Sequence, residues 1–555
     1  MLKTKFDKYI RLNSSISIYH FTIIMFKKIL LLLLFELIAF NFLSAEEDKI
    51  LYQAQKFKYM LETINAQYAD TVDFEKLCDK TFSFMLKSLD EQSLYYSNDE
   101  YKKIKESYSG VNVGVGLEVV KLGDTLYVYE VYKKSSADSA GLVAGDKIMF
   151  INGTSVKDLS TNDANNLILG DTNTYVELII KRGFSNNLTI HKLRRAVVEL
   201  PSVKAEFMID GSDIGYIAFS RFTDISDVEF KESVERLVKL GMKKLLLDLR
   251  GNPGGYLNKA AFIADQFIPG EKTITYTEAR NQDNVVKYTS KNGDILEGMP
   301  IIVLMDKNSA SGSEIIAGAV QDFDLGLVVG ETSFGKGSIQ KFWNMNDGSA
   351  FRITVGKYHT PSGRSIQKPS IKEDNAMIDP AMELSHDSET IKRVNEALKA
   401  TGGRTHLPLF KTAKGRTIIG AGGIIPDVMV KSDTTTLLTT YFKSRGIFLE
   451  WAFRYLAENS ASLQLNYKDN PKKFYKEWQI SNENLKEFVN LAVSKKLWND
   501  SMFVKDKSYI INYMKASVAD LFFGHNEYFR ILQLFDKQVQ EAIIRFYDAE
   551  NILKN

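Results

Sequence analysis

Cysteine and histidine are scarce in this chain of 555 residues. Cys78 is the single cysteine, which excludes a disulfide within the chain and a metal cluster built from cysteines. The 6 histidines are scattered and contain no HExxH pair, so we expect no bound metal. An excess of charge is also missing, because 71 basic and 69 acidic residues leave a net charge of only +2. That balance provides no general attraction to nucleic acid.

Glycine and proline are nearly absent from two long segments. Residues 46–109 are charged and place apolar side chains at roughly helical spacing. Residues 436–555 contain many aromatic side chains, and no glycine lies between Gly446 and Gly524. We therefore predict a helical N-terminal region and a helical C-terminal extension. The extension is better explained as a packed helical domain than as a cage for a ligand.

One long apolar run lies near the N-terminus. Residues 29–43 follow two lysines, and Ser44 and Ala45 come directly after the run. This order predicts a signal peptide over residues 1–45, with Met25 as an alternative start of the protein. The run is short for a membrane span, although an uncleaved anchor that associates the protein with the membrane is the alternative. In either case we expect an exported protein, located in the periplasm or cell envelope, or secreted.

Glycine becomes frequent in the middle of the chain. Residues 110–195 contain short apolar runs separated by glycines, which predicts a small unit made mostly of β-strands. From residue 196 to about 435, apolar runs typical of buried strands alternate with helical patterns. This alternation predicts an α/β core, within a chain that is multidomain α+β as a whole.

Ser311 lies at a predicted turn from strand to helix. An apolar run over residues 301–305 precedes it, and a helical pattern over residues 315–320 follows. Such a turn exposes the hydroxyl beside free backbone N–H groups, and Gly312 allows a carbonyl to approach them closely. Ser311 is therefore a candidate nucleophile. The alternative is an ordinary helix cap, because Glu314 completes a capping-box pattern.

Lys336 follows 25 residues later, within the glycine-rich segment 330–337. A lysine enclosed by the fold acts as a base when its pKa falls from about 10.4 to roughly 7–8. Gln340 shares one strand face with Ser338 and Lys336, from which it orients the amine. A solvated loop lysine is one alternative. A phosphate-binding loop is another, but Gly337 replaces the hydroxyl residue that such a loop requires.

A third motif, DLRGNPGG over residues 248–255, follows another predicted buried strand. Its glycines permit positive φ angles and a close backbone approach, as an oxyanion-binding N–H requires. An ordinary tight turn is the alternative.

Together these motifs resemble the C-terminal processing peptidases, also called tail-specific serine proteases. The resemblance extends over residues 89–430 and rests on eight stretches: 89–93 (LDEQS), 114–117 (GVGL), 140–146 (AGLVAGD), 248–255 (DLRGNPGG), 308–322 (NSASGSEIIAGAVQD), 330–340 (GETSFGKGSIQ), 360–363 (TPSG) and 422–427 (GGIIPD). It implies Ser311 as nucleophile, Lys336 as base and Gln340 as its orienting partner. It also implies an oxyanion hole formed by backbone N–H groups near Gly254, Gly255 and Gly312, although family members often carry alanine at the last position.

The same resemblance implies the architecture and the substrates. Residues 196–435 would form a crotonase/ClpP-like α/β protease core, and residues 110–195 a PDZ domain. The loop Gly114, Val115, Gly116 and Leu117 would hold the terminal carboxylate of a peptide. The N-terminal helical region would pair with a second copy of the chain, as related enzymes do.

We therefore predict a serine endopeptidase that forms an acyl-enzyme and uses neither metal nor nucleotide. Its partners would be protein substrates with unstructured C-terminal tails. The first alternative is a catalytically idle PDZ scaffold or chaperone of the cell envelope. The second is a nucleotide-dependent enzyme that binds magnesium–ATP near Lys336.

Overall fold

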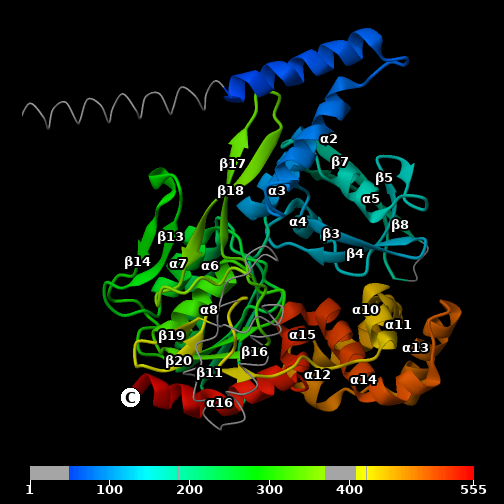
Figure 1. Cartoon of the computed structure of the whole chain (residues 1–555). Helices are drawn as coiled ribbons and strands as arrows, with labels where there is room; N and C mark the ends of the chain where they lie inside the picture. The colour runs from blue at the N-terminus through cyan, green and yellow to red at the C-terminus, as the bar shows by residue number, and fades with distance from the viewer. Residues whose placement is uncertain (1–48, 184–186, 369–407, 421, 555) are drawn as a thin grey trace, which may run out of the picture. The chain divides into compact units, whose positions relative to one another are not determined.

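The computed structural model describes residues 49–183, 187–368, 408–420 and 422–554 (Figure 1). The predicted signal peptide over residues 1–45, with the alternative start Met25, lies outside this range. No helix within it is long and apolar enough to cross a membrane. The chain divides into two units, residues 1–85 and 86–555.

The described part of the first unit is helical. One helix covers residues 49–67, and α2 (Phe74–Lys87) begins after a short turn. Apolar side chains on both helices are exposed to solvent, among them Tyr59, Met60 and Phe84. The second unit contains the sheets and the remaining helices.

A six-stranded sheet forms the centre of the second unit. Its strands, in spatial order, are β10 (Val203–Met208), β11 (Ile214–Phe219), β12 (Lys244–Asp248), β15 (Ile301–Met305), β16 (Gly326–Gly330) and β21 (Val428–Met429). Only β10 runs antiparallel to its neighbour. The inner strands are almost continuous apolar runs because both faces of the sheet are covered.

Successive residues of each strand face opposite layers of helices. Leu245, Leu247 and Val303 pack in one apolar core with α6 (Ser226–Lys239), α7 (Leu257–Asp265) and α8 (Gly312–Asp322). Leu246 and Ile302 pack in the other core, against α16 (Lys537–Lys554). The last helix of the chain is therefore one layer of the three-layer core (Figure 1).

An antiparallel sheet lies beside this core and carries the segment that follows Lys336. Its path is β1 (Leu94–Tyr96), β18 (Ala350–His359), β13 (Thr273–Glu278) and β14 (Lys287–Thr289), and β17 (Ser338–Asn344) also pairs with β18. A separate two-stranded sheet is formed by β19 (Leu409–Lys411) and β20 (Thr417–Ile419).

Residues 117–194 form a small β unit with its own apolar core. Its strands are β3 (Leu117–Leu122), β4 (Thr125–Val131), β5 (Lys147–Ile151), β7 (Tyr175–Lys181) and β8 (Leu188–Arg194), with β6 (Thr154–Ser155) paired to β5. Two short helices, α4 (Ser136–Ser139) and α5 (Thr161–Ile168), complete it. The chain enters through β2 (Val111–Gly114) and leaves through β9 (Ala196–Glu199), which pair with each other.

The C-terminal helices form an aromatic-rich domain before the chain returns to the core. They are α10 (Leu437–Ser444), α11 (Ile447–Tyr467), α12 (Pro471–Glu477), α13 (Asn482–Ser494), α14 (Asp500–Phe523) and α15 (His525–Leu532). Phe442, Phe448, Trp451 and Phe488 are buried and pack ring against ring in their core. These aromatic side chains therefore form the core of a packed domain, as predicted.

The role of α16 as a core layer can be tested with two neighbouring aromatic residues. Phe546 is 2 % exposed and contacts the central sheet, whereas Tyr547 is 72 % exposed. We expect Phe546→Ala to lower the free energy of unfolding by about 3–5 kcal/mol. Tyr547→Ala should change it by less than about 0.5 kcal/mol. Urea unfolding of both variants checks this, and equal effects would show that α16 is not packed on the sheet.

Candidate active site

Ser311 immediately precedes α8 and has a strained backbone. Its φ of 55° and ψ of −111° lie where side-chain-bearing residues are rarely found. The turn is held by its own hydrogen bonds: the N–H of Ser311 donates to Glu314 Oε2 at 2.7 Å, and its carbonyl accepts from the N–H of Ile315 at 3.0 Å. Ser311 lines a cavity of about 490 Å³. The predicted nucleophile therefore faces an open space with its backbone fixed.

Glu314 connects this turn to the segment that carries Lys336. Its carboxylate is fully buried and accepts four hydrogen bonds. Oε2 accepts from the N–H groups of Ser311 and Lys336, while Oε1 accepts from the Gly335 N–H and the Ser333 hydroxyl. Burial raises the pKa of Glu314 above its ordinary value, and these hydrogen bonds oppose that rise. One carboxylate thus fixes the backbone beneath both predicted catalytic residues.

Lys336 lines the same cavity as Ser311. Burial, together with the nearby Arg352, lowers the pKa of its amine to about 8, and the Glu314 charge opposes this lowering. Among the residues with described positions, Lys336 Nζ has no hydrogen-bond or ion-pair partner. Tyr358 makes a second link between the Ser311 and Lys336 segments. Its hydroxyl lies 2.5 Å from the Lys336 carbonyl oxygen and 3.2 Å from the Ser311 carbonyl oxygen.

Gln340 reaches the same cavity but contacts a different residue than expected. Its side-chain amide donates to the Ser338 hydroxyl at 2.8 Å. No hydrogen bond joins Gln340 to Lys336 within the described part of the chain. Lys336 precedes β17, which begins only at Ser338, so it does not share a strand with Gln340 as expected, although Lys336, Ser338 and Gln340 all line the same cavity.

The glycines of the 248–255 turn touch the nucleophile segment. A Cβ on Gly254 would lie 2.6 Å from Ser311 Cβ and 3.1 Å from Gly312 N. A Cβ on Gly255 would lie 2.0 Å from the Phe222 carbonyl oxygen. Gly312 has the same constraint, because a Cβ there would be 2.8 Å from the Phe222 ring. A Cβ at any of these three positions would therefore lie less than 3.0 Å from a neighbouring atom, which must shift to make room.

The three predicted oxyanion-hole N–H groups differ in their availability. The N–H of Gly254 donates to Asn252 Oδ1 at 2.9 Å, so it is already occupied. The N–H groups of Gly255 and Gly312 have no partner among the residues that the structure describes. Asn252 also anchors the turn to the nucleophile segment, since its carbonyl accepts from the Ala310 N–H and the Ser313 hydroxyl, both at 3.0 Å.

Part of the cavity wall is aromatic. It includes Tyr101 and Tyr108 of α3 (Asn98–Ser109), together with Tyr256 and Phe342. Arg352 lies among these rings, with its guanidinium 5.6 Å from the Tyr96 ring centre and 5.7 Å from that of Phe342.

Sequence reasoning did not single out Arg352 or Tyr358, and it considered Glu314 only as a helix cap. The capping-box spacing was the one local signal for Glu314. Neither Arg352 nor Tyr358 carries a local signal, because both come from β18 and reach the site only through strand pairing. The described residues contain no cluster of His, Cys, Asp and Glu side chains that could hold a metal ion.

The predicted peptide loop lies in the small β unit. Residues 114–117 connect β2 to β3, and a Cβ on Gly116, whose φ is +81°, would lie 2.1 Å from Ser135 Cβ. β3 is an edge strand of its sheet, and α5 packs beside it. An edge strand with a free side is where an extended peptide adds to a sheet.

Family models match three parts of the chain. Peptidase family S41 matches residues 213–377, which contain Ser311, Lys336 and the 248–255 turn. A PDZ domain matches residues 127–182. A family of unknown function, DUF8443, matches residues 439–524.

Similar proteins agree with these matches. The carboxy-terminal-processing protease of Bartonella bacilliformis is 34% identical over 342 residues, which cover 61% of this chain and 78% of that protein. The carboxy-terminal processing protease CtpB of Bacillus subtilis is 33% identical over 339 residues, 61% of this chain and 70% of that protein. A solved photosystem II D1 C-terminal processing protease is 25% identical over 55% of this chain and 85% of its own, with a TM-score of 0.33.

The chain belongs to the carboxy-terminal processing proteases of peptidase family S41, which are serine peptidases with a PDZ domain. The predicted family, its PDZ domain and the enzyme class are confirmed, and the structure itself contains the expected mixture of helices and sheets.

The contact between Gly254 and Ser311 leads to a test with a matched control. Gly254→Ala places a methyl group against Ser311, whereas alanine at Gly251, which also has a positive φ, meets nothing within 4 Å. We expect Gly254→Ala to lower kcat at least tenfold, because displacing reacting groups by about 1 Å costs up to roughly 100-fold. Gly251→Ala should retain kcat within about threefold. Hydrolysis of an unstructured peptide measures both, and equal kcat values would contradict the proposed proximity of turn and nucleophile.

Proposed function

We propose that Ser311 is the nucleophile and Lys336 the general base of a serine endopeptidase. The observation that carries this proposal is a half-buried amine, with a pKa of about 8, in the same cavity as a serine at a strained helix start. A lysine is a useful base near neutral pH when burial lowers its pKa in this way. Glu314, which accepts N–H groups from both residues, keeps the two segments together.

The reaction follows from this geometry. Neutral Lys336 accepts the proton of the Ser311 hydroxyl while the oxygen attacks the substrate carbonyl. The N–H groups of Gly255 and Gly312 receive the negative oxygen that develops, and Gly254 joins them only if its N–H leaves Asn252. Protonated Lys336 then gives its proton to the leaving amine, and water hydrolyses the acyl-enzyme with the same base. Gln340 orients the site through Ser338 and makes no direct bond to the amine.

The substrates we propose are proteins with unstructured C-terminal tails. The tail adds to the edge strand β3, beside α5, with its carboxylate in the loop of residues 114–117. The aromatic wall of the active-site cavity takes an apolar side chain next to the bond that is cleaved. Neither a metal ion nor a nucleotide is required for these steps.

The remaining features of the proposal concern architecture and location. We propose a crotonase/ClpP-like core over residues 196–435, with α16 as an added layer. The signal pattern over residues 1–45 supports export to the periplasm or cell envelope, either as a cleaved, soluble enzyme or tied to the membrane by an uncleaved segment. Exposed apolar side chains on the N-terminal helices support pairing with a second copy of the chain.

Removing the nucleophile separates an enzyme from an idle scaffold. Ser311→Ala should abolish cleavage of a protein with an unstructured tail, while its thermal unfolding stays close to that of the wild type. Lys336→Met should be similarly inactive, because no other base replaces the amine. Lys307→Met is the control, since Lys307 is exposed in the same segment as Ser311. Turnover by Ser311→Ala at the wild-type rate would refute the assignment.

The pH dependence of kcat/KM tests the base. Only the neutral amine accepts a proton, so activity should rise with pH around an apparent pKa of about 8 and be lost below it. The positive charge of Arg352 lowers the pKa of Lys336, so Arg352→Gln should move this rise to higher pH. Lys341→Gln, which removes another positive charge from the cavity wall, should move it less. A rise that stays in place in Arg352→Gln would contradict this account.

A further inference from the structure

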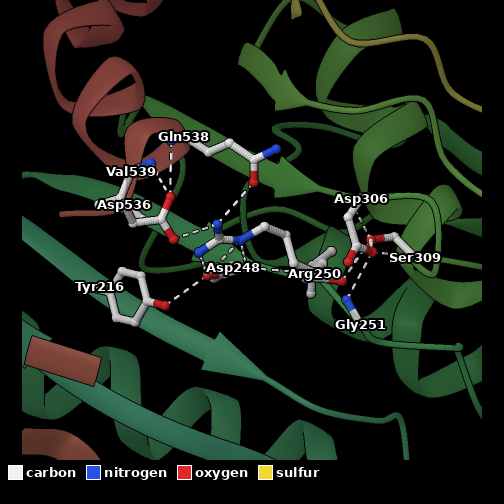
Figure 2. A network of polar contacts seen from close by, with 10 residues as sticks. Tyr216, Asp248, Arg250, Gly251, Asp306, Ser309, Asp536, Gln538 and Val539 are labelled. Atoms are coloured by element: carbon white, nitrogen blue, oxygen red, sulfur yellow. Dashed lines mark hydrogen bonds and ion pairs between the residues drawn. The ribbon is translucent and has the colours of Figure 1, made fainter. Parts of the chain in front are cut away.

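The turn that carries Gly254 and Gly255 is attached to the C-terminal helix through Arg250. Figure 2 shows Asp536, Gln538 and Asp248 around the Arg250 guanidinium. Nη1 donates to Asp536 Oδ2 at 2.6 Å and to Gln538 Oε1 at 2.9 Å. Asp536 directly precedes α16, and Gln538 is its second residue. The predicted oxyanion turn is therefore bonded to an element nearly 290 residues away in sequence.

The two oxygens of the Asp536 carboxylate accept different hydrogen bonds. Its Oδ1 accepts from the N–H groups of Gln538 and Val539, at 2.9 and 3.2 Å, and so caps the start of α16. Its Oδ2 is left to accept from Arg250. The cap fixes the carboxylate on a helix that is itself packed on the central sheet. Gln538 is 2 % exposed and donates to the Val430 carbonyl at 2.8 Å, so it is equally fixed.

The other side of Arg250 is held by the strand that leads into the turn. Asp248, the last residue of β12, accepts from Arg250 Nε at 2.9 Å and Nη2 at 2.5 Å. The Tyr216 hydroxyl donates to Asp248 at 2.7 Å (Figure 2). Arg250 is thus clamped between two carboxylates, and its side chain is only 20% exposed. Removing either carboxylate would leave the positive charge of Arg250 only partly compensated.

The clamp lies close to the reacting groups along the backbone. Gly251, the next residue, donates its N–H to Asp306 Oδ1 at 3.0 Å. Asp306 also accepts from the Ser309 N–H at 3.0 Å, two residues before the nucleophile. Only three residues separate Arg250 from Gly254. A displacement of Arg250 would therefore be transmitted to both the turn and the nucleophile segment.

We propose that Asp536 and Gln538 are positioning residues for the oxyanion hole. They act through Arg250, hold the 248–255 turn against the Ser311 segment and do not touch substrate. This inference rests on the proposed function. Both residues lie outside residues 213–377 and 439–524, the parts matched by the peptidase and DUF8443 models. The C-terminal extension thus contributes to catalysis as well as to packing.

The test separates kcat from KM. Loss of one oxyanion donor costs about 10²–10³ in kcat, so a displaced turn in Asp536→Ala should lower kcat at least tenfold. KM for a tailed peptide should stay within about twofold, because the PDZ domain and the cavity wall are unchanged. The pH at which activity rises should also stay in place, because Lys336 is unaffected. Asp536→Asn keeps one oxygen for the cap of α16 but turns an amide N–H toward Arg250, so it should lose kcat like Asp536→Ala while the helix start stays capped.

Asp433→Ala is the matched control. Asp433 pairs with Lys537, the first residue of α16, at 2.8 Å, and no contact joins it to Arg250 in the described structure. We expect its kcat to stay within about twofold of wild type. If Asp433→Ala loses as much kcat as Asp536→Ala, general loosening of α16 explains the effect and the inference fails. It fails equally if KM rises while kcat stays unchanged.

Two further comparisons keep the test decisive. If Asp536→Ala does not fold, Asp536→Asn and Gln538→Met decide, and wild-type kcat in both overturns the inference. Ser311→Ala is measured in parallel. If that variant retains turnover, the proposed function itself is wrong. If it is inactive while Asp536→Ala matches wild type, only the positioning role is wrong.

Discussion

The proposed active site depends on one buried carboxylate. Glu314 is the third residue of α8, a helix whose eleven residues are all buried between the sheet and its neighbours. Because the helix cannot move without disturbing the core, the carboxylate is a fixed point for the Ser311 and Lys336 N–H groups. Folding of the core therefore brings together two residues that are 25 positions apart in sequence. The Tyr358 hydroxyl adds a second link between the same two segments.

The surroundings of the Lys336 amine and those of the 248–255 turn have different roles in the proposed reaction. The Lys336 amine is partly buried in a cavity that also contains Arg352, and both the burial and the positive charge of Arg352 favour its neutral form. In the proposed reaction, Asn252 and the Arg250 clamp hold the 248–255 turn, so that the Gly255 and Gly312 N–H groups are in place before substrate arrives. In the proposed mechanism the first environment produces the general base, and the second stabilises the negative oxygen that forms when this base acts.

Local sequence patterns were enough to predict the strand-to-helix turn at Ser311, the buried strands and the close-packed glycines. They were not enough where the structure depends on distant pairing. Arg352 and Tyr358 reach the site because β18 pairs with β17, and the register shift at Gln340 has no signature in the sequence. The apolar spacing in residues 537–554 predicts a helix with a buried face. It does not reveal that this face, through Phe546, covers the protease sheet.

The central claim is that a neutral lysine amine is available at physiological pH. It is tested most directly by an NMR titration of ¹³C-labelled lysine in the Ser311→Ala protein, with the Lys336 signal identified by its absence from Lys336→Met. The account predicts a pKa of about 8 for this amine. A value near 10.4, the ordinary pKa of lysine, would contradict it.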